Sequence, residues 1–216
     1  MLHRPGSNYT ITFRSGSVTL TSLQSEEALA LTGGTLTLNR ASAVNNNFTL
    51  NGGTLDGGGD LTIAGQFTWL AGTLRGNGRT LSNGGMLIDG GSGKALHGRT
   101  LNNAAFAIWR GTSGISGADG GTVNNLAGAT LDSQSDASLS YGCCLGAIPT
   151  LNNAGTLRKS AGSGTTAFTS VTFNNTGVVQ IQSGTLEHNG NSVGTSTGNF
   201  HSEAGTALNF RRALSP

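Results

Sequence analysis

Residues 48–74 read FTLNGGTLDGGGDLTIAGQFTWLAGTL and carry the strongest indication of the fold. It holds two copies of one unit, Phe-Thr-x-x-x-Gly-Thr-Leu, of which the first begins at Phe48 and the second at Phe67. Apolar residues and Thr alternate at the start of each copy, which is the period-2 pattern of a half-buried strand. The Gly-rich segments between the strand-like runs supply turns with positive φ. The stretch therefore indicates short β-strands that recur once per coil.

The repetition continues along the chain. Gly-Thr-Leu also occurs at 34–36, 155–157 and 184–186. A second motif, Thr-x-Asn-Asn, takes over in the C-terminal half, with copies at 100–103, 122–125, 150–153 and 172–175. The spacing between copies is 22, then 28, then 22 again. A period near 20 with two or three strands per unit is typical of a solenoid.

The predicted fold is an all-β, single-stranded parallel β-helix of about ten coils, about 45 Å long at the spacing of paired strands. Residues 1–216 are expected to form one continuous solenoid, cut from a longer repeat protein. The segments 111–121 and 133–149 interrupt the repeat and are predicted to be loop insertions on one face, where function tends to lie. The run 25–31 is the one brief helical candidate. The side chains expected to point inward are Leu36, Leu55, Phe67, Trp69, Leu74, Phe106, Ile108, Leu151 and Phe173.

The paired asparagines have a natural place in such a stack. Asn tolerates the left-handed backbone of a corner, and stacked amides can hydrogen-bond from coil to coil. The plainer alternative is that Asn-Asn is simply a good turn former. The residues of the candidate Asn ladder are Asn102, Asn103, Asn124, Asn125, Asn152, Asn153, Asn174 and Asn175.

Composition excludes several classes of protein. Charged residues are 10% of the chain, hydrophobic residues are 35%, and the formal net charge is +2. Disorder combines low hydrophobicity with high net charge, so it is not expected. Arg75, Arg79, Arg99 and Arg110 form the nearest approach to a basic cluster and are interpreted as a solvated face, so no nucleic-acid partner is expected. No segment approaches the roughly 20 apolar residues that span a membrane, so no membrane insertion is expected.

Several runs of the sequence resemble a known family of proteins. The residues that carry the resemblance are the runs 17–29 and 31–38, together with Leu101–Ala104 and Leu126–Leu131. They are similar to the repeat regions of very large bacterial surface proteins, in the style of filamentous haemagglutinin and autotransporter passengers. The resemblance covers the chain up to about Phe210. It implies a right-handed helix, an extracellular or cell-surface location, and a role as stalk or adhesin, and it transfers no catalytic residue.

The candidate motifs for catalysis or cofactor binding each lack a required residue, spacing or copy. The run 88–95 resembles the end of a phosphate loop, but Ile88 and Ala95 replace its first Gly and its Ser or Thr. At 76–81 a dinucleotide fingerprint lacks its last Gly. The partial calcium-roll motif at 56–60 occurs once, whereas such sites need tandem copies. The four histidines show no metal-ligand spacing. No catalytic, cofactor-binding or metal-binding residue is therefore expected.

Two alternatives to a structural role stay open. A polysaccharide lyase or glycosidase would need close acids. Asp56, Asp60 and Asp89 are the candidates, but Asp89 does not follow Asp56 by a whole number of coils. An ice-binding surface would need flat rows of Thr, and the uneven spacing of the repeats argues against such a lattice. The role of Cys143 and Cys144 is left open, since sequence neighbours rarely bridge each other.

The expected partners follow from the predicted role as a stalk or adhesin. They are host or matrix glycans, or neighbouring cell-surface proteins. Both ends of the chain are strand-like and offer no cap, so end-to-end self-association is also expected.

Overall fold

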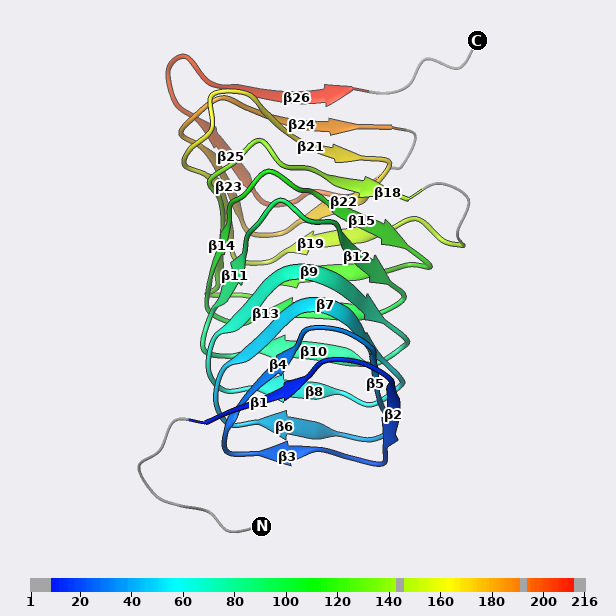
Figure 1. Cartoon of the computed structure of the whole chain (residues 1–216). Helices are drawn as coiled ribbons and strands as arrows, with labels where there is room; N and C mark the ends of the chain where they lie inside the picture. Colours follow the sequence, from blue (N-terminus) through cyan, green and yellow to red (C-terminus); the bar gives the residue numbers. More distant parts are fainter. Residues whose placement is uncertain (1–8, 143–145, 191–193, 212–216) are drawn as a thin grey trace.

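The structure is a computed structural model that describes residues 9–142, 146–190 and 194–211. The described residues form 26 β-strands and no helix, and every strand pairing is parallel between successive coils. The strands stack into one solenoid of about nine turns, one fewer than expected. Figure 1 shows the coils as a column, with β3 at the bottom and β26 at the top. The predicted parallel β-solenoid is confirmed.

Each coil has up to three sides, which we call sides one, two and three. On side one lie β1 (Thr10–Phe13), β4 (Ala28–Leu31), β7 (Phe48–Asp56), β9 (Phe67–Arg75), β11 (Met86–Ile88), β14 (Phe106–Trp109), β17 (Thr130–Ser133), β20 (Thr156–Lys159), β23 (Val178–Ile181) and β25 (Asn199–Ser202). On side two lie β2 (Ser17–Leu20), β5 (Thr35–Leu38), the second halves of β7 and β9, β12 (Lys94–His97), β15 (Ile115–Ala118), β18 (Leu139–Tyr141), β21 (Thr165–Thr169), β24 (Thr185–Asn189) and β26 (Ala207–Arg211). Side three is a separate sheet of β3 (Gln24–Ser25), β6 (Ser42–Val44), β8 (Leu61–Ile63), β10 (Arg79–Ser82), β13 (Thr100–Asn103), β16 (Thr122–Asn125), β19 (Thr150–Asn153) and β22 (Thr172–Asn175).

The core fills the inside of the column. Phe48 stacks on Phe67 with ring centroids 5.5 Å apart, and Phe67 contacts Trp69 at 6.4 Å. The register explains the stacking, since Phe48 pairs with Phe67 one coil later. Of the nine side chains expected inside, seven are buried: Leu36, Leu55, Phe67, Trp69, Leu74, Leu151 and Phe173.

The prediction was wrong for Phe106 and Ile108. Phe106 is 47% exposed, and the buried residues of its strand are Ala107 and Trp109. Ala107 pairs with the inward Met86, so register with the previous coil sets which face of β14 is internal. A shift of the register by one residue turns every side chain of the strand to the opposite face of the sheet. All four residues of β14 are apolar, so alternation could not reveal the choice.

The glycine of the Gly-Thr-Leu motif lies where neighbouring coils touch. Gly53 has φ +68°, and a Cβ placed on it would lie 2.7 Å from the carbonyl oxygen of Gly34 in the previous coil. A side chain is therefore excluded both by the backbone conformation and by the close approach. The predicted turn at 51–53 is in fact a bend inside the long strand β7, with a register shift at Asn51.

The two segments predicted as insertions each contain a strand. Residues 111–121 include β15, and residues 133–149 include β18. Thr122 still pairs with Thr150 across the longest coil of this sheet. The helical candidate at 25–31 contributes to β3 and β4 instead. Cys143 and Cys144 lie outside the described residues.

Candidate functional site

The second asparagine of each Thr-x-Asn-Asn motif belongs to a ladder inside the column. Nδ2 of Asn103 donates to Oδ1 of Asn125 at 2.9 Å, and the same link joins Asn125 to Asn153 and Asn153 to Asn175 at 2.8 Å. All four residues are at most 1% exposed. The ladder continues to Ser196, whose hydroxyl accepts from Nδ2 of Asn175 at 3.4 Å.

The inner amides also bond to the backbone of side one. Nδ2 of Asn103 donates to the carbonyl oxygens of Ala105 and Thr130 at 3.0 Å. Nδ2 of Asn125 donates likewise to Thr156 at 2.9 Å. Because buried amides are costly without partners, this second set of bonds makes a polar row tolerable inside the core.

The first asparagine of each motif belongs to a second ladder on the outer surface of side three. Here Nδ2 of Asn124 donates to Asn102, Asn152 donates to Asn124, and Asn174 donates to Asn152, each at 2.8 Å. In this outer ladder the later coil donates to the earlier one, whereas in the inner ladder the earlier coil donates to the later one. At its end, the backbone N–H of Thr195 donates to Oδ1 of Asn174 at 2.9 Å.

The asparagines do not act as left-handed corners. Among the described residues, the non-glycine positions with positive φ are Asp119 and Ser170. All eight candidate asparagines lie within strands, and strand pairing aligns their side chains from coil to coil.

Thr residues form a row beside the outer Asn ladder. Thr100, Thr122, Thr150 and Thr172 pair in register and are half-buried. The hydroxyl of Thr122 donates to the carbonyl of Gly120 at 3.0 Å. The other three hydroxyls have no hydrogen-bond partner among the described residues.

Arg99 corrects the interpretation of the basic cluster. It is fully buried, whereas Arg75 and Arg79 have exposed side chains. Its Nε donates to the hydroxyl of Thr80 at 2.8 Å. Its two terminal nitrogens donate to the carbonyl oxygens of Gly57, Gly59, Arg75 and Arg79 at distances from 2.9 to 3.3 Å.

This arrangement connects three successive coils through one side chain. Burial lowers the pKa of Arg99 to about 10, so the guanidinium is charged at neutral pH. Backbone carbonyls solvate the cation in place of water. The sequence offered no signal for this role, because Arg99 stands in a corner outside the alternating pattern.

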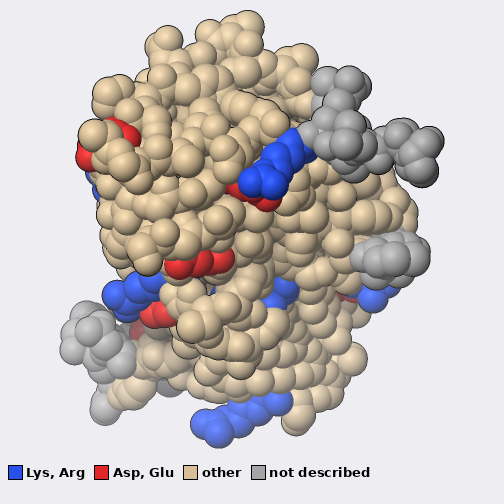
Figure 2. All heavy atoms as spheres, turned by 90° about the horizontal axis from the view of Figure 1, so that it is seen from above, with Lys and Arg blue, Asp and Glu red and all other residues tan. Residues whose placement is uncertain are grey.

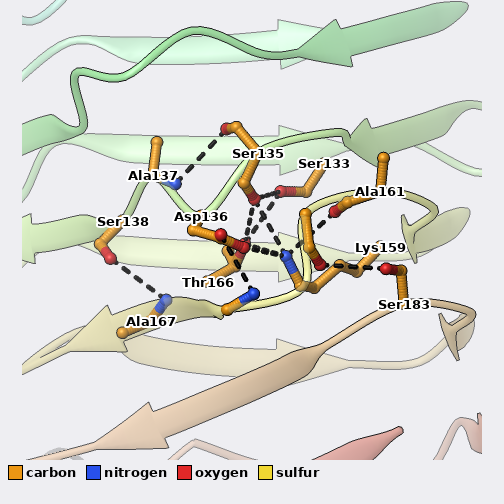
Figure 3. Close-up of polar contacts among 12 residues, drawn as sticks. Ser133, Ser135, Asp136, Ala137, Ser138, Lys159, Ala161, Thr166, Ala167 and Ser183 are labelled. Atoms are coloured by element: carbon orange, nitrogen blue, oxygen red, sulfur yellow. Dashed lines mark hydrogen bonds and ion pairs between the residues drawn. The ribbon is translucent and has the colours of Figure 1, made fainter.

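Lys159 is a second buried cation, shown in Figure 3. Its side chain is 0% exposed, and Nζ lies 2.9 Å from Oδ1 of Asp136. Nζ also donates to the carbonyls of Ser135 and Ala161 and to the hydroxyl of Thr166, at 3.0, 3.1 and 3.2 Å. The cluster holds the 134–138 corner against the next coil. The hydrogen bond from Lys159 keeps the pKa of Asp136 below its ordinary value.

Ion pairs follow the same coil-to-coil rule. In each of the six pairs found among the described residues, an acid pairs with a base of the next coil: Asp56–Arg75, Asp60–Arg79, Asp89–Arg110, Asp132–Arg158, Asp136–Lys159 and Glu187–Arg211. In the first two pairs the arginine follows its acid by one local coil length, the same spacing that separates Phe48 from Phe67. That spacing is present in the sequence and could have predicted these two ion pairs.

The remaining chemical candidates do not assemble. Asp56, Asp60 and Asp89 each face their own arginine rather than one another. Lys94, from the run that resembles a phosphate loop, is buried and donates to the carbonyl of Ser92 at 3.1 Å. Burial lowers the pKa of Lys94. The described residues hold no group of three His, Cys, Asp or Glu side chains suited to a metal ion.

The end of the column that carries β26 is weakly charged. Viewed from above, toward the end that carries β26, charged side chains are few and scattered among uncharged atoms (Figure 2). Within the described part of the chain, no helix has the length and apolarity to cross a membrane. Comparison of the chain with protein families, curated proteins and solved structures finds no match to any of them.

Proposed function

We propose that this chain is a stalk or adhesive segment of a bacterial cell-surface or secreted protein, without catalytic activity. The observation that carries the proposal is the direction of its polar bonds. The two Asn ladders, the carbonyl contacts of Arg99, the Lys159 cluster and the ion pairs all connect one coil to another along the axis. A rod that transmits load along its length needs bonds in that direction.

The architecture supports the same role. In a solenoid each coil contacts mainly its neighbours, so length can grow without a change of core. Arg99 adds bonds between coils, because it donates to the carbonyl of Arg75 in the preceding coil and to that of Gly57 in the coil before it. The resemblance to filamentous-haemagglutinin and autotransporter repeats adds export to the proposal.

Location in the organism of origin tests the proposal. Antibodies raised against the purified chain are expected to label intact cells or the culture medium, and added protease is expected to remove the cellular signal. Labelling only after the cells are permeabilised would contradict the proposal. Release of reducing sugars from pectin or alginate by the purified chain would favour the polysaccharide-lyase alternative.

A further inference from the structure

The outer surface of side three carries hydrogen-bonding groups that the fold leaves unused. In the outer ladder, each link uses one amide N–H of the donor and one carbonyl lone pair of the acceptor. An Asn amide has two N–H donors and a carbonyl with two lone pairs. Within the ladder, Asn124 and Asn152 each therefore keep one donor and one acceptor for a partner outside the protein.

The Thr row adds a hydroxyl to each of these coils. Thr100, Thr150 and Thr172 have no internal partner among the described residues, and each is both donor and acceptor. The pattern repeats at the spacing of paired strands, about 4.8 Å along the axis. The result is a regular array of neutral donors and acceptors over four coils.

The array is uncharged and in register from coil to coil. The four strands from Thr100 to Thr172 stay in register although the middle coil is longer than the two around it. The drift in coil length therefore does not disorder this surface. Arg79 pairs with Thr100 and bounds the array on one side, and Thr195 closes it on the other.

We propose that this surface, made of the Thr row and the outer Asn ladder, binds a neutral, hydroxyl-rich polysaccharide chain that lies along the solenoid axis. The inference rests on the adhesive role proposed above and names its site and ligand class. Sugar hydroxyls both donate and accept, which matches amides and hydroxyls that each have both capacities free. The four paired Thr-x-Asn motifs carry no charged side chain, and Arg79 at their edge is already paired with Asp60, so the array offers polyanions and polycations no unpaired charge.

The geometry selects a polymer over a small sugar. Small ligands bind in concave pockets that bury most of their surface, whereas this face is an open sheet. A repeating ligand contacts several coils at once, and linked contacts raise overall affinity beyond that of each one. Ice is the other repeating array of hydroxyl groups. An ice-binding surface would need flat rows of Thr. Here the row beside the Thr row consists of Asn amides that bond to one another, which favours the polysaccharide.

The test compares two triple variants of the full chain. Thr100→Val, Thr150→Val and Thr172→Val remove the free hydroxyls from side three while keeping β-branched shape. Thr35→Val, Thr49→Val and Thr54→Val make the same change on sides one and two. Binding is measured by co-sedimentation with cellulose and chitin and by affinity electrophoresis in mannan and mixed-linkage β-glucan. Unfolding midpoints of both variants verify that they fold.

We expect binding to at least one neutral polysaccharide, weakened about tenfold or more by the side-three variant and unchanged by the control. Equal weakening by both variants would overturn the inference, as would no binding to any of the four polymers. Binding to alginate or dextran sulfate alone would also overturn it. Thermal hysteresis without polysaccharide binding would assign the surface to ice instead. Surface labelling of cells with no polysaccharide binding would reject this inference and leave the stalk proposal standing.

Discussion

Asn103 and Asn125 lie one above the other inside the column, and Nδ2 of Asn103 donates to Oδ1 of Asn125 at 2.9 Å from one coil to the next. Their sequence neighbours Asn102 and Asn124 form the same bond on the outside, with the donor and acceptor order reversed. Two adjacent identical residues thus build two separate ladders, because successive side chains of a strand point to opposite faces.

The inner ladder is expected to matter more for stability than the outer one. Asn125→Ala removes a donor to Asn153 and to the carbonyl of Thr156, both in the next coil. Leaving such buried groups unpaired should lower the free energy of unfolding by about 2–4 kcal/mol. Asn124→Ala is the matched control, since water can replace its bonds, and its cost should stay below about 1 kcal/mol. Urea unfolding followed by circular dichroism measures both, and equal costs would contradict the distinction.

The buried guanidinium should not tolerate a conservative change. Arg99→Lys keeps the charge, but an ammonium group cannot reproduce the bonds of the guanidinium to four carbonyl oxygens and the Thr80 hydroxyl in the two preceding coils. We expect a loss of about 3 kcal/mol or more in unfolding free energy. Arg110→Lys, at the exposed pair with Asp89, should change the unfolding midpoint little. A stable Arg99→Lys variant would show that water or backbone movement can take over the carbonyls.

The motif glycine should resist even a methyl group. Gly53→Ala places a Cβ against the backbone of the previous coil at a positive φ, which should cost about 1–3 kcal/mol. Gly58→Ala is the control, because a Cβ there meets nothing within 4 Å and φ is outside the positive range. Thermal unfolding of the two variants should separate them by several degrees. Equal midpoints would mean that the coils can move apart at Gly53.

Acid should loosen the corner held by Lys159. Because the pKa of Asp136 is lowered from 3.8 by the hydrogen bond from Lys159, the pair stabilises the fold above that value. This contribution is lost as the pH falls through the lower, folded-state pKa. Asp136→Asn should therefore show a shallower loss of thermal stability than the parent chain between about pH 5 and pH 2. Glu203→Gln is the control and should retain the steep profile. Parallel profiles for Asp136→Asn and the parent would contradict this role for the pair.

The terminal coils should promote association of copies end to end. Tyr9 and Ile11 are 56% and 41% exposed at one end, and Phe200 and Phe210 are 38% and 59% exposed at the other. Open strand edges template further pairing. Light scattering is expected to show apparent mass rising with concentration. A monomer at all concentrations would indicate that the ends do not pair.

The solenoid follows from patterns that can be read along the chain. Alternation in runs such as Phe67-Thr68-Trp69 and the recurrence of Gly-Thr-Leu specify a strand pattern and a coil length, both of which are local properties. The Thr-x-Asn-Asn copies likewise pointed to a ladder of amides. Two ion-paired arginines could also have been found, since Arg75 and Arg79 follow their acids by one coil.

The facing of some strands and the burial of two cations depend instead on pairing between coils. In β14 every residue is apolar, and pairing of Ala107 with Met86 turned Phe106 outward. Arg99 stands in a corner, where no period-2 pattern specifies direction. Lys159 takes an inward position of β20 where an apolar residue is expected, and its burial depends on acceptors such as the carbonyl of Ser135 in the preceding coil. The physical reason is that a coil buries little alone, so facing and burial are set by what the next coil places against it.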